Sequence, residues 1–212
     1  KRLVLDLKLI ADAGIIGYPN SGKSTLLSAV SQARPKIADY PFTTLEPVLG
    51  VVVAGYQSFV LADIPGIIEG AHEGRGLGLD FLRHIERTKV FIHLVDGSSQ
   101  HPVADFKNVE AELAAYQPSL KERPRIVAIN KIDLSDVRAC MIELEKAFRV
   151  FGLPVYFVSA ATGEGVRELM NKTLELVSEA PLLSRKKEGE EFKVFRPLPL
   201  PAKKSAKRGE EK

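Results

Sequence analysis

Cysteine is nearly absent from this chain of 212 residues, in which Cys140 is the single one. One thiol cannot form an intrachain disulfide or a cysteine-based metal site, so both kinds of protein are excluded. Because Cys140 lies in a helical pattern, we expect its thiol to be packed in the core rather than catalytic. No apolar run reaches the roughly 18 residues that span a bilayer, and no secretory signal is present. These absences favour a protein of the reducing cytoplasm.

Histidine is also scarce, with four residues at no spacing typical of metal ligands. His93 lies inside an apolar run of strand length, and we expect it to be buried with a hydrogen-bond partner.

Most of the chain has no excess of charge of either sign, although the net charge of the whole chain is +3. Residues 185–212 hold ten Lys and Arg against five Asp and Glu, and the preceding part is nearly neutral. A basic tail of this kind could contact RNA or another polyanion, but it is more often a solvated linker.

Apolar runs of strand length alternate with helical patterns, which is typical of an α/β fold with a mostly parallel sheet. We expect strands at residues 13–17, 47–54, 58–63, 90–96, 125–130 and 154–159. We expect helices at residues 23–32, 78–88, 103–116, 135–150 and 165–177. Only three residues join the second and third strands, so these two must form a hairpin and one strand must run antiparallel. In this architecture ligands bind at the carboxyl ends of the strands.

A phosphate-binding loop follows the first expected strand and has the pattern G-x-x-x-x-G-K-[ST]. Its backbone amides and the start of the next helix would face phosphate oxygens. Lys23 would reach the outer phosphates, and the hydroxyl of Ser24 would bind Mg²⁺. The residues expected to contact a nucleotide here are Gly17, Tyr18, Pro19, Asn20, Ser21, Gly22, Lys23, Ser24 and Thr25.

A second motif, Asp63-Ile64-Pro65-Gly66, ends the third expected strand. An aspartate at this position can hold Mg²⁺ through water, as a Walker-B aspartate does. The backbone amide of Gly66 would lie near the third phosphate.

A third motif, Phe42-Thr43-Thr44-Leu45, lies between the first helix and the second strand. One of its threonines could coordinate Mg²⁺ when a third phosphate is bound, and we favour Thr44. The alternative is a turn whose threonines only make local hydrogen bonds.

The fourth motif, Asn130-Lys131-Ile132-Asp133, discriminates best between nucleotides. The carboxylate of Asp133 can accept hydrogen bonds from the ring N–H and the amino group of guanine, whereas adenine would leave it unpaired. The stem of Lys131 would lie along the base, and Asn130 would tie this loop to the phosphate loop. A fifth segment, Ser159-Ala160-Ala161, follows the last strand, and the Ala160 amide could donate to the guanine oxygen.

Together these segments resemble the motifs of translation-factor-related GTPases over residues 10–178, and most closely those of the Obg family. The distinguishing stretches are DLKLIAD at residues 6–12, ADYPFTTL at 38–45, DIPGIIEGA at 63–71, GRGLG at 74–78 and FLRHIER at 81–87. The resemblance implies a Ras-like P-loop GTPase fold, with six mostly parallel strands, one of them antiparallel, and helices on both faces. It also implies GTP and GDP as ligands, Mg²⁺ as cofactor and a cytoplasmic monomer. The implied partner is the large ribosomal subunit, in its assembly or in a stress response.

The same resemblance divides the chain into three parts, because Obg proteins carry a glycine-rich N-terminal domain and often a C-terminal extension. We expect residues 1–12 to be a linker from a missing N-terminal domain and residues 13–180 to be the GTP-binding domain. Residues 181–212 would be a basic linker or the start of the extension.

Hydrolysis is expected to be slow. Lys23, Thr44 and Gly66 are the expected catalytic residues, but Ile67 follows Gly66 where Ras-like enzymes have a glutamine that orients water. A binding module with negligible turnover is therefore the alternative, and a P-loop ATPase or kinase is disfavoured by Asp133. Several relatives with an asparagine at the position of Asn20 use it to help hold K⁺ near the phosphates, although Asn20 could equally satisfy a turn.

Overall fold

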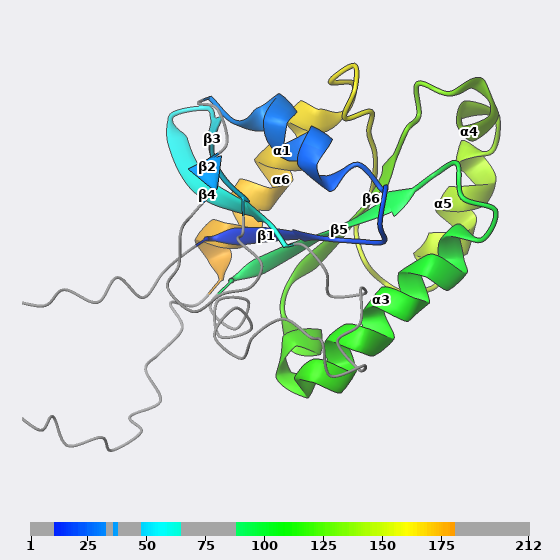
Figure 1. Ribbon diagram of the computed structural model, residues 1–212, viewed down its shortest axis with the longest axis horizontal. Coiled ribbons are helices and arrows are strands. Elements are labelled where there is room, and N and C mark those ends of the chain that lie inside the picture. Colours follow the sequence, from blue (N-terminus) through cyan, green and yellow to red (C-terminus); the bar gives the residue numbers. More distant parts are fainter. Residues whose placement is uncertain (1–10, 33–35, 38–47, 65–87, 181–212) are drawn as a thin grey trace, which may run out of the picture.

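The computed structural model of the chain describes residues 11–32, 36–37, 48–64 and 88–180, and helices lie on both faces of its one sheet (Figure 1). The strands are β1 (Ala13–Ile16), β2 (Lys36–Ile37), β3 (Val48–Ala54), β4 (Gln57–Asp63), β5 (Val90–Asp96), β6 (Arg125–Asn130) and β7 (Val155–Phe157). The helices are α1 (Lys23–Val30), α3 (Pro102–Tyr116), α4 (Ser135–Ala139), α5 (Met141–Arg149) and α6 (Val166–Glu179), with a 3₁₀ turn, η1, at Pro118–Glu122.

The strand order across the sheet is β2-β3-β4-β1-β5-β6-β7. Strands β4, β1, β5, β6 and β7 pair in parallel, whereas β3 is antiparallel to both of its neighbours. The α/β fold, the six strands and the predicted hairpin are thereby confirmed. The two-residue strand β2 at the edge was not predicted, because two residues are too few to show an alternating pattern.

The central strands are buried on both faces, which explains their continuous apolar sequences. On β5, Val90, Ile92 and Leu94 belong to one core cluster, while Phe91 and Val95 belong to clusters on the opposite face. Successive side chains of a strand point to opposite faces, so a run such as VFIHLVD supplies both cores at once.

Two helical layers cover these faces. Helices α1 and α6 pack on one face through Leu26, Leu27, Leu169 and Met170, and Figure 1 shows the two helices together on that side. Helices α3, α4 and α5 contribute to the clusters on the other face. The cores therefore lie between the sheet and its two helical layers, and the loops at the carboxyl ends of the strands lie outside these cores.

The helix predicted over residues 135–150 is wrong in one respect, because it is two helices that meet at Cys140. The predicted core position of Cys140 is also wrong, since this cysteine is exposed. In a continuous helix, position 140 would share the inner face with Val137 and Leu144, which are buried. Met141 has the same helical spacing from these two residues and packs against the core, whereas Cys140 is exposed at the junction of the two helices.

The helix predicted at residues 78–88 lies almost entirely outside the described residues, as do the two terminal linkers. In the part of the chain that the structure describes, no helix is long and apolar enough to cross a membrane.

Candidate nucleotide-binding site

Three of the motif-bearing loops and the loop that follows β5 begin at the same edge of the sheet. Strands β4, β1, β5 and β6 lie side by side in this order, and their carboxyl ends carry Asp63, the phosphate loop, Asp96 and Asn130, respectively. After β1 the chain forms α1 on one face of the sheet, and after β5 it forms α3 on the other face. This edge is therefore a topological switch point, where open α/β sheets bind their ligands.

The phosphate loop has a backbone shape that few residues tolerate. Gly22 has a φ of 98°, and a Cβ atom there would lie 2.3 Å from Nδ2 of Asn130, so only glycine fits. Asn20 has a φ of 62°, which asparagine accepts better than most residues. Helix α1 begins directly after Gly22, with no side-chain cap from the described residues and no acidic residue in its first turn. The start of a helix of this kind can bind an anion through its first backbone amides.

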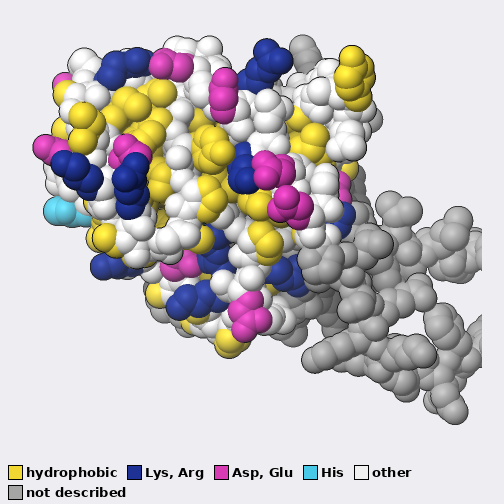
Figure 2. Space-filling view, turned by 180° about the vertical axis from the view of Figure 1, so that it is seen from behind, with side chains coloured by type: hydrophobic (Ala, Val, Ile, Leu, Met, Phe, Trp, Pro, Cys, Tyr) yellow, Lys and Arg dark blue, Asp and Glu magenta, His cyan; other side chains and the backbone are white. Residues whose placement is uncertain are grey.

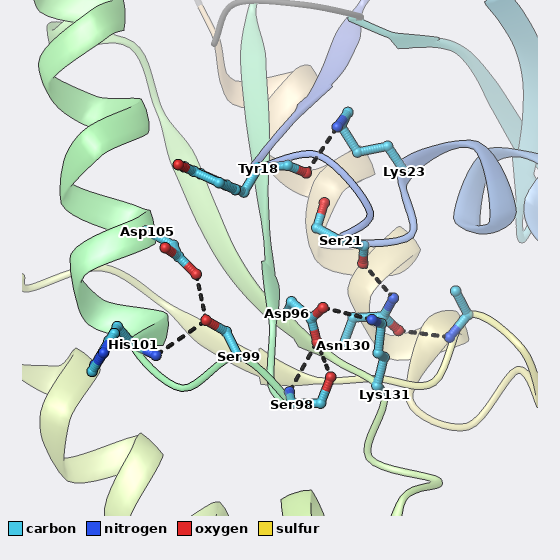
Figure 3. A network of polar contacts seen from close by, with 11 residues as sticks. Tyr18, Ser21, Lys23, Asp96, Ser98, Ser99, His101, Asp105, Asn130 and Lys131 are labelled. Atoms are coloured by element: carbon cyan, nitrogen blue, oxygen red, sulfur yellow. Dashed lines mark hydrogen bonds and ion pairs between the residues drawn. The ribbon is translucent and has the colours of Figure 1, made fainter. Parts of the chain in front are cut away.

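The ammonium group of Lys23 is folded back onto its own loop. Its Nζ atom donates to the carbonyl oxygens of Gly17 at 3.0 Å and Tyr18 at 3.1 Å, and Figure 3 shows Lys23 beside Tyr18 at the mouth of the loop. A phosphate oxygen would give this cation stronger, charge-assisted hydrogen bonds than neutral carbonyls do.

The two described residues predicted to hold Mg²⁺ are in contact with each other. The hydroxyl of Ser24 donates to Oδ2 of Asp63 at 2.7 Å, across 39 residues of sequence. Asp63 is buried, and its Oδ1 atom has no hydrogen-bond partner among the described residues. Burial raises the pKa of Asp63, although Ser24 and the charge of Lys23 partly oppose this. A hydroxyl and a buried carboxylate with a free oxygen fit a small divalent cation that prefers oxygen ligands.

Asn130 joins the predicted base-binding loop to the phosphate loop, as the sequence analysis expected. Its Nδ2 atom donates to the carbonyl oxygen of Ser21 at 2.8 Å, and its Oδ1 atom accepts the amide of Ala160 at 2.9 Å. Three segments far apart in sequence are therefore fixed to one buried side chain (Figure 3). The Ala160 amide, predicted to donate to a guanine oxygen, already has this acceptor and would have to share it.

Asp133 is oriented by a residue to which sequence reasoning assigned no such role. The hydroxyl of Ser159 donates to its Oδ1 atom at 2.6 Å and also accepts the amide of Thr162 at 3.1 Å. Ser159 is fully buried, whereas Asp133 is exposed. One carboxylate oxygen is thus held, and the other is left for a ligand.

Arg138 connects the two predicted base-binding loops from outside, a role that no sequence pattern indicated. Its Nε atom donates to the carbonyl oxygen of Ile132 at 3.1 Å, and its Nη2 atom lies 2.6 Å from the carboxylate of Glu164. Both side chains are about half exposed, so this pair orders the loops only weakly.

Several predicted site residues lie outside the described residues, namely Phe42, Thr43, Thr44, Leu45, Pro65 and Gly66. Of the remaining ones, Tyr18, Pro19, Ile64 and Ala161 lie in the loops at the carboxyl edge, and Thr25 is exposed on the first turn of α1. Among the described residues, the structure therefore brings the predicted phosphate, Mg²⁺ and base motifs to the carboxyl edge of the sheet. Residues 38–47 and 65–87 lie outside the described part of the chain.

A hollow of about 620 Å³ lies on the other side of residues 130–133, between the start of α3 and helices α4 and α5. Ser99, Val103, Leu134 and Cys140 are among its lining residues, and none of them belongs to the phosphate loop. Figure 2 shows apolar side chains gathered on the side that carries α4 and α5. Because it has neither Lys23 nor Asp133, we do not assign this hollow to the nucleotide.

His93 is a structural residue, as predicted. It is buried, its Nδ1 atom lies 3.1 Å from Glu110, and burial lowers its pKa although Glu110 opposes this. Glu110 also pairs with Arg125. In the described part of the chain, no group of His, Cys, Asp and Glu residues could hold a metal by itself.

Comparison with known proteins is consistent with this geometry. The family model of the 50S ribosome-binding GTPases matches residues 12–131. The chain is 53% identical to a GTPase Obg of Dehalococcoides mccartyi over 93% of its own length and 47% of that protein. It is 57% identical to a GTPase Obg of an Anaeromyxobacter species over 84% of its own length and 53% of that protein. The chain thus spans about half the length of the curated relatives it matches.

Solved structures support the fold alone. The cytosolic domain of L. pneumophila FeoB is 21% identical with a TM-score of 0.58, covering 77% of this chain and 62% of that one. The G domain of the T. maritima FeoB iron transporter is 24% identical with a TM-score of 0.57, covering 77% and 96%, respectively. With a Ras-like fold and 53% and 57% identity to these two relatives, the chain belongs to the Obg family of GTPases.

Proposed function

We propose that this chain binds GTP and GDP with Mg²⁺ between the phosphate loop and residues 130–133, and hydrolyses GTP slowly. The observation that carries this proposal is the 2.8 Å hydrogen bond from Asn130 to the carbonyl oxygen of Ser21. It joins the loop that carries Asp133 to the phosphate loop, which supports one binding site for both ends of a nucleotide. A single nucleoside triphosphate could therefore touch both.

Each described residue would have a definite task. Lys23 would exchange the carbonyl oxygens of its own loop for phosphate oxygens, while the first amides of α1 donate to the same phosphates. Ser24 and Asp63 would hold Mg²⁺, which when bound neutralises charge on the phosphates. Asp133, held by Ser159, would accept two hydrogen bonds from guanine and leave adenine unmatched.

Slow hydrolysis follows from the sequence after Gly66. The side chain of Ile67 has no polar atom with which to orient a water molecule, so the rate would depend on charge stabilisation by Lys23 and the loop amides. A bound K⁺ near Asn20 would add positive charge where other GTPases have an arginine finger. The same isoleucine supports the second candidate function, a nucleotide-dependent binding module with negligible turnover.

The biological role would be that of a cytoplasmic switch whose nucleotide state a partner senses. The description of the matching family model, 50S ribosome-binding GTPase, supports the large ribosomal subunit as that partner. We further propose that the GTP-binding part acts as a monomer.

Isothermal titration with GTP, GDP and ATP, with Mg²⁺ or with EDTA, tests the proposal. We expect guanine nucleotides to bind at least about 100-fold more tightly than ATP, since adenine leaves Asp133 without partners. Lys23→Ala should remove most of the affinity, whereas Lys146→Ala, a change of equal charge on the exposed part of α5, should not. Equal affinity for ATP and GTP would refute the proposal.

Single-turnover hydrolysis in saturating KCl separates the two candidate functions. Slow release of phosphate from bound GTP supports a GTPase. Tight binding without any release over many hours supports the binding module.

A further inference from the structure

Lys131 is held across the candidate base site by a residue that belongs to none of the motifs. Its Nζ atom lies 2.5 Å from Oδ2 of Asp96, the last residue of β5. Lys131 itself has a φ of 70°, a backbone conformation that lysine seldom adopts. Figure 3 shows the Lys131 side chain extended from the loop toward Asp96, next to Asn130.

The carboxylate of Asp96 is also held by hydrogen bonds from its own turn. Its Oδ1 atom accepts the amide of Ser98 at 2.9 Å and the hydroxyl of Ser98 at 2.6 Å. Asp96 is also the register partner of Asn130 in the parallel pairing of β5 with β6, and the amide of Gly97 donates to the Asn130 carbonyl oxygen. One oxygen is thus used by its own turn, and the other is aimed at Lys131.

The ion pair between Asp96 and Lys131 is partly shielded from water. The Asp96 side chain is 17% exposed and that of Lys131 is 32% exposed. Burial acts to raise the pKa of Asp96, but the hydrogen bonds from Lys131 and Ser98 outweigh it and hold the pKa below its ordinary value. Asp96 therefore stays ionised at neutral pH and remains an acceptor for the ammonium group.

We propose that Asp96 is a positioning residue for guanine-nucleotide binding, which acts by anchoring the ammonium group of Lys131. A lysine side chain has four rotatable bonds, and a free one would have to be ordered each time a base binds. Anchored at its far end, the hydrocarbon stem of Lys131 forms a prearranged surface on which a purine can pack. This inference rests on the proposed function, because it assumes that the base lies beside Lys131.

A double-mutant cycle in the whole chain tests the inference, with GDP affinity and GDP dissociation rate as readouts. Asp96→Asn keeps an oxygen for Ser98 but loses the charge that holds Lys131. We expect it to weaken GDP binding about tenfold, mainly through faster dissociation. Lys131→Met should have a similar effect. Both changes break the same ion pair. Adding Asp96→Asn to the Lys131→Met variant should therefore lower GDP affinity by less than about a further twofold.

The control is Asp12→Asn. Asp12 directly precedes β1, at the amino ends of the strands, opposite the carboxyl edge that carries the candidate base site. Asp12 pairs with Lys89 at 3.0 Å, its side chain is 18% exposed, and its other oxygen also accepts a backbone amide. The same loss of charge and of an ion pair occurs there, far from the base site. We expect unchanged GDP affinity, which would separate positioning from a general effect of lost charge.

Additive losses in the cycle, or an Asp96→Asn variant with unchanged GDP affinity, would overturn the inference. Should Asp96→Asn fail to give a cooperative thermal transition, Asp96→Glu replaces it in the same cycle. It must lower GDP affinity in the wild-type background and not in the Lys131→Met background, and any other result counts against anchoring. Failure of the proposed function is a separate result, namely a wild-type chain that does not prefer GDP to ADP.

Discussion

The Nδ2 atom of Asn130 donates to the carbonyl oxygen of Ser21 at 2.8 Å, although 109 residues separate the two in sequence. Asn130 is 3% exposed and Ser21 is fully buried, so water cannot take the place of either partner. This contact joins two loops that are far apart in sequence, and under the proposed function its loss should affect binding and stability together.

We predict that Asn130→Ala lowers the free energy of unfolding by about 1–3 kcal/mol, because it leaves the Ser21 carbonyl and the Ala160 amide buried without partners. GDP affinity should fall about tenfold or more, since the base-binding loop is no longer tied to the phosphate loop. Urea denaturation and titration with GDP measure the two effects. Unchanged GDP affinity in a folded variant would show that the contact is only structural.

Asp133→Asn should change which base is preferred. A carboxamide has a donor where the carboxylate has an acceptor, so it can pair with xanthine, which has an oxygen in place of the guanine amino group. We expect GDP affinity to drop by at least about tenfold and the preference to shift toward xanthosine diphosphate. Competition of the two diphosphates for one site measures this shift. A variant that keeps its preference for GDP would exclude Asp133 as the residue that reads the base.

The sequence was sufficient to predict the strands and the site edge for a physical reason. Strands such as VFIHLVD and RIVAIN are buried on both faces and are therefore continuously apolar, and the polar residues that follow them mark the carboxyl ends. Asn130 could be linked to the phosphate loop from the sequence because its whole motif has a characteristic pattern.

The contacts between side chains from different elements could not be predicted in this way. Asp96 and Lys131 are 35 residues apart, and only the register of β5 against β6 brings them together. The break at Cys140 is equally hidden, because residues on both sides of it have helical spacing. The role of Ser159 depends on the loop that turns it toward Asp133.

The potassium hypothesis predicts a dependence of hydrolysis on the monovalent cation. GTP hydrolysis should be faster in KCl than in NaCl at the same ionic strength, because K⁺ held near Asn20 would stabilise negative charge on the phosphates. Asn20→Ala should make the two rates alike while GDP affinity is retained. Equal rates for the wild-type chain in both salts would remove Asn20 as a cation ligand.

Asp63 should cost stability when it is ionised without a metal. Burial raises its pKa in the folded chain above the unfolded value. The protonated carboxyl of Asp63 therefore favours the folded chain. This contribution to the free energy of unfolding is fully present below the unfolded pKa, near 3.9, and is lost as the pH rises through the folded pKa. We predict that Asp63→Asn, in EDTA and without nucleotide, increases the free energy of unfolding at pH 7 on the order of 1 kcal/mol. The difference from wild type should shrink toward pH 4, where the wild-type carboxyl becomes protonated.

The same substitution should weaken the response to Mg²⁺, because a carboxamide gives the cation a neutral ligand in place of an anionic one. Chemical denaturation at several pH values, with Mg²⁺ plus GDP or with EDTA, measures both effects in one series. Asp96→Asn is the comparison, since the pKa of Asp96 is lowered and its removal should destabilise the chain at pH 7 instead. If Asp63→Asn were destabilising in EDTA at pH 7, the ionised carboxylate would have to be stabilised in the folded chain, and the unfavourable burial argued from its raised pKa would be wrong.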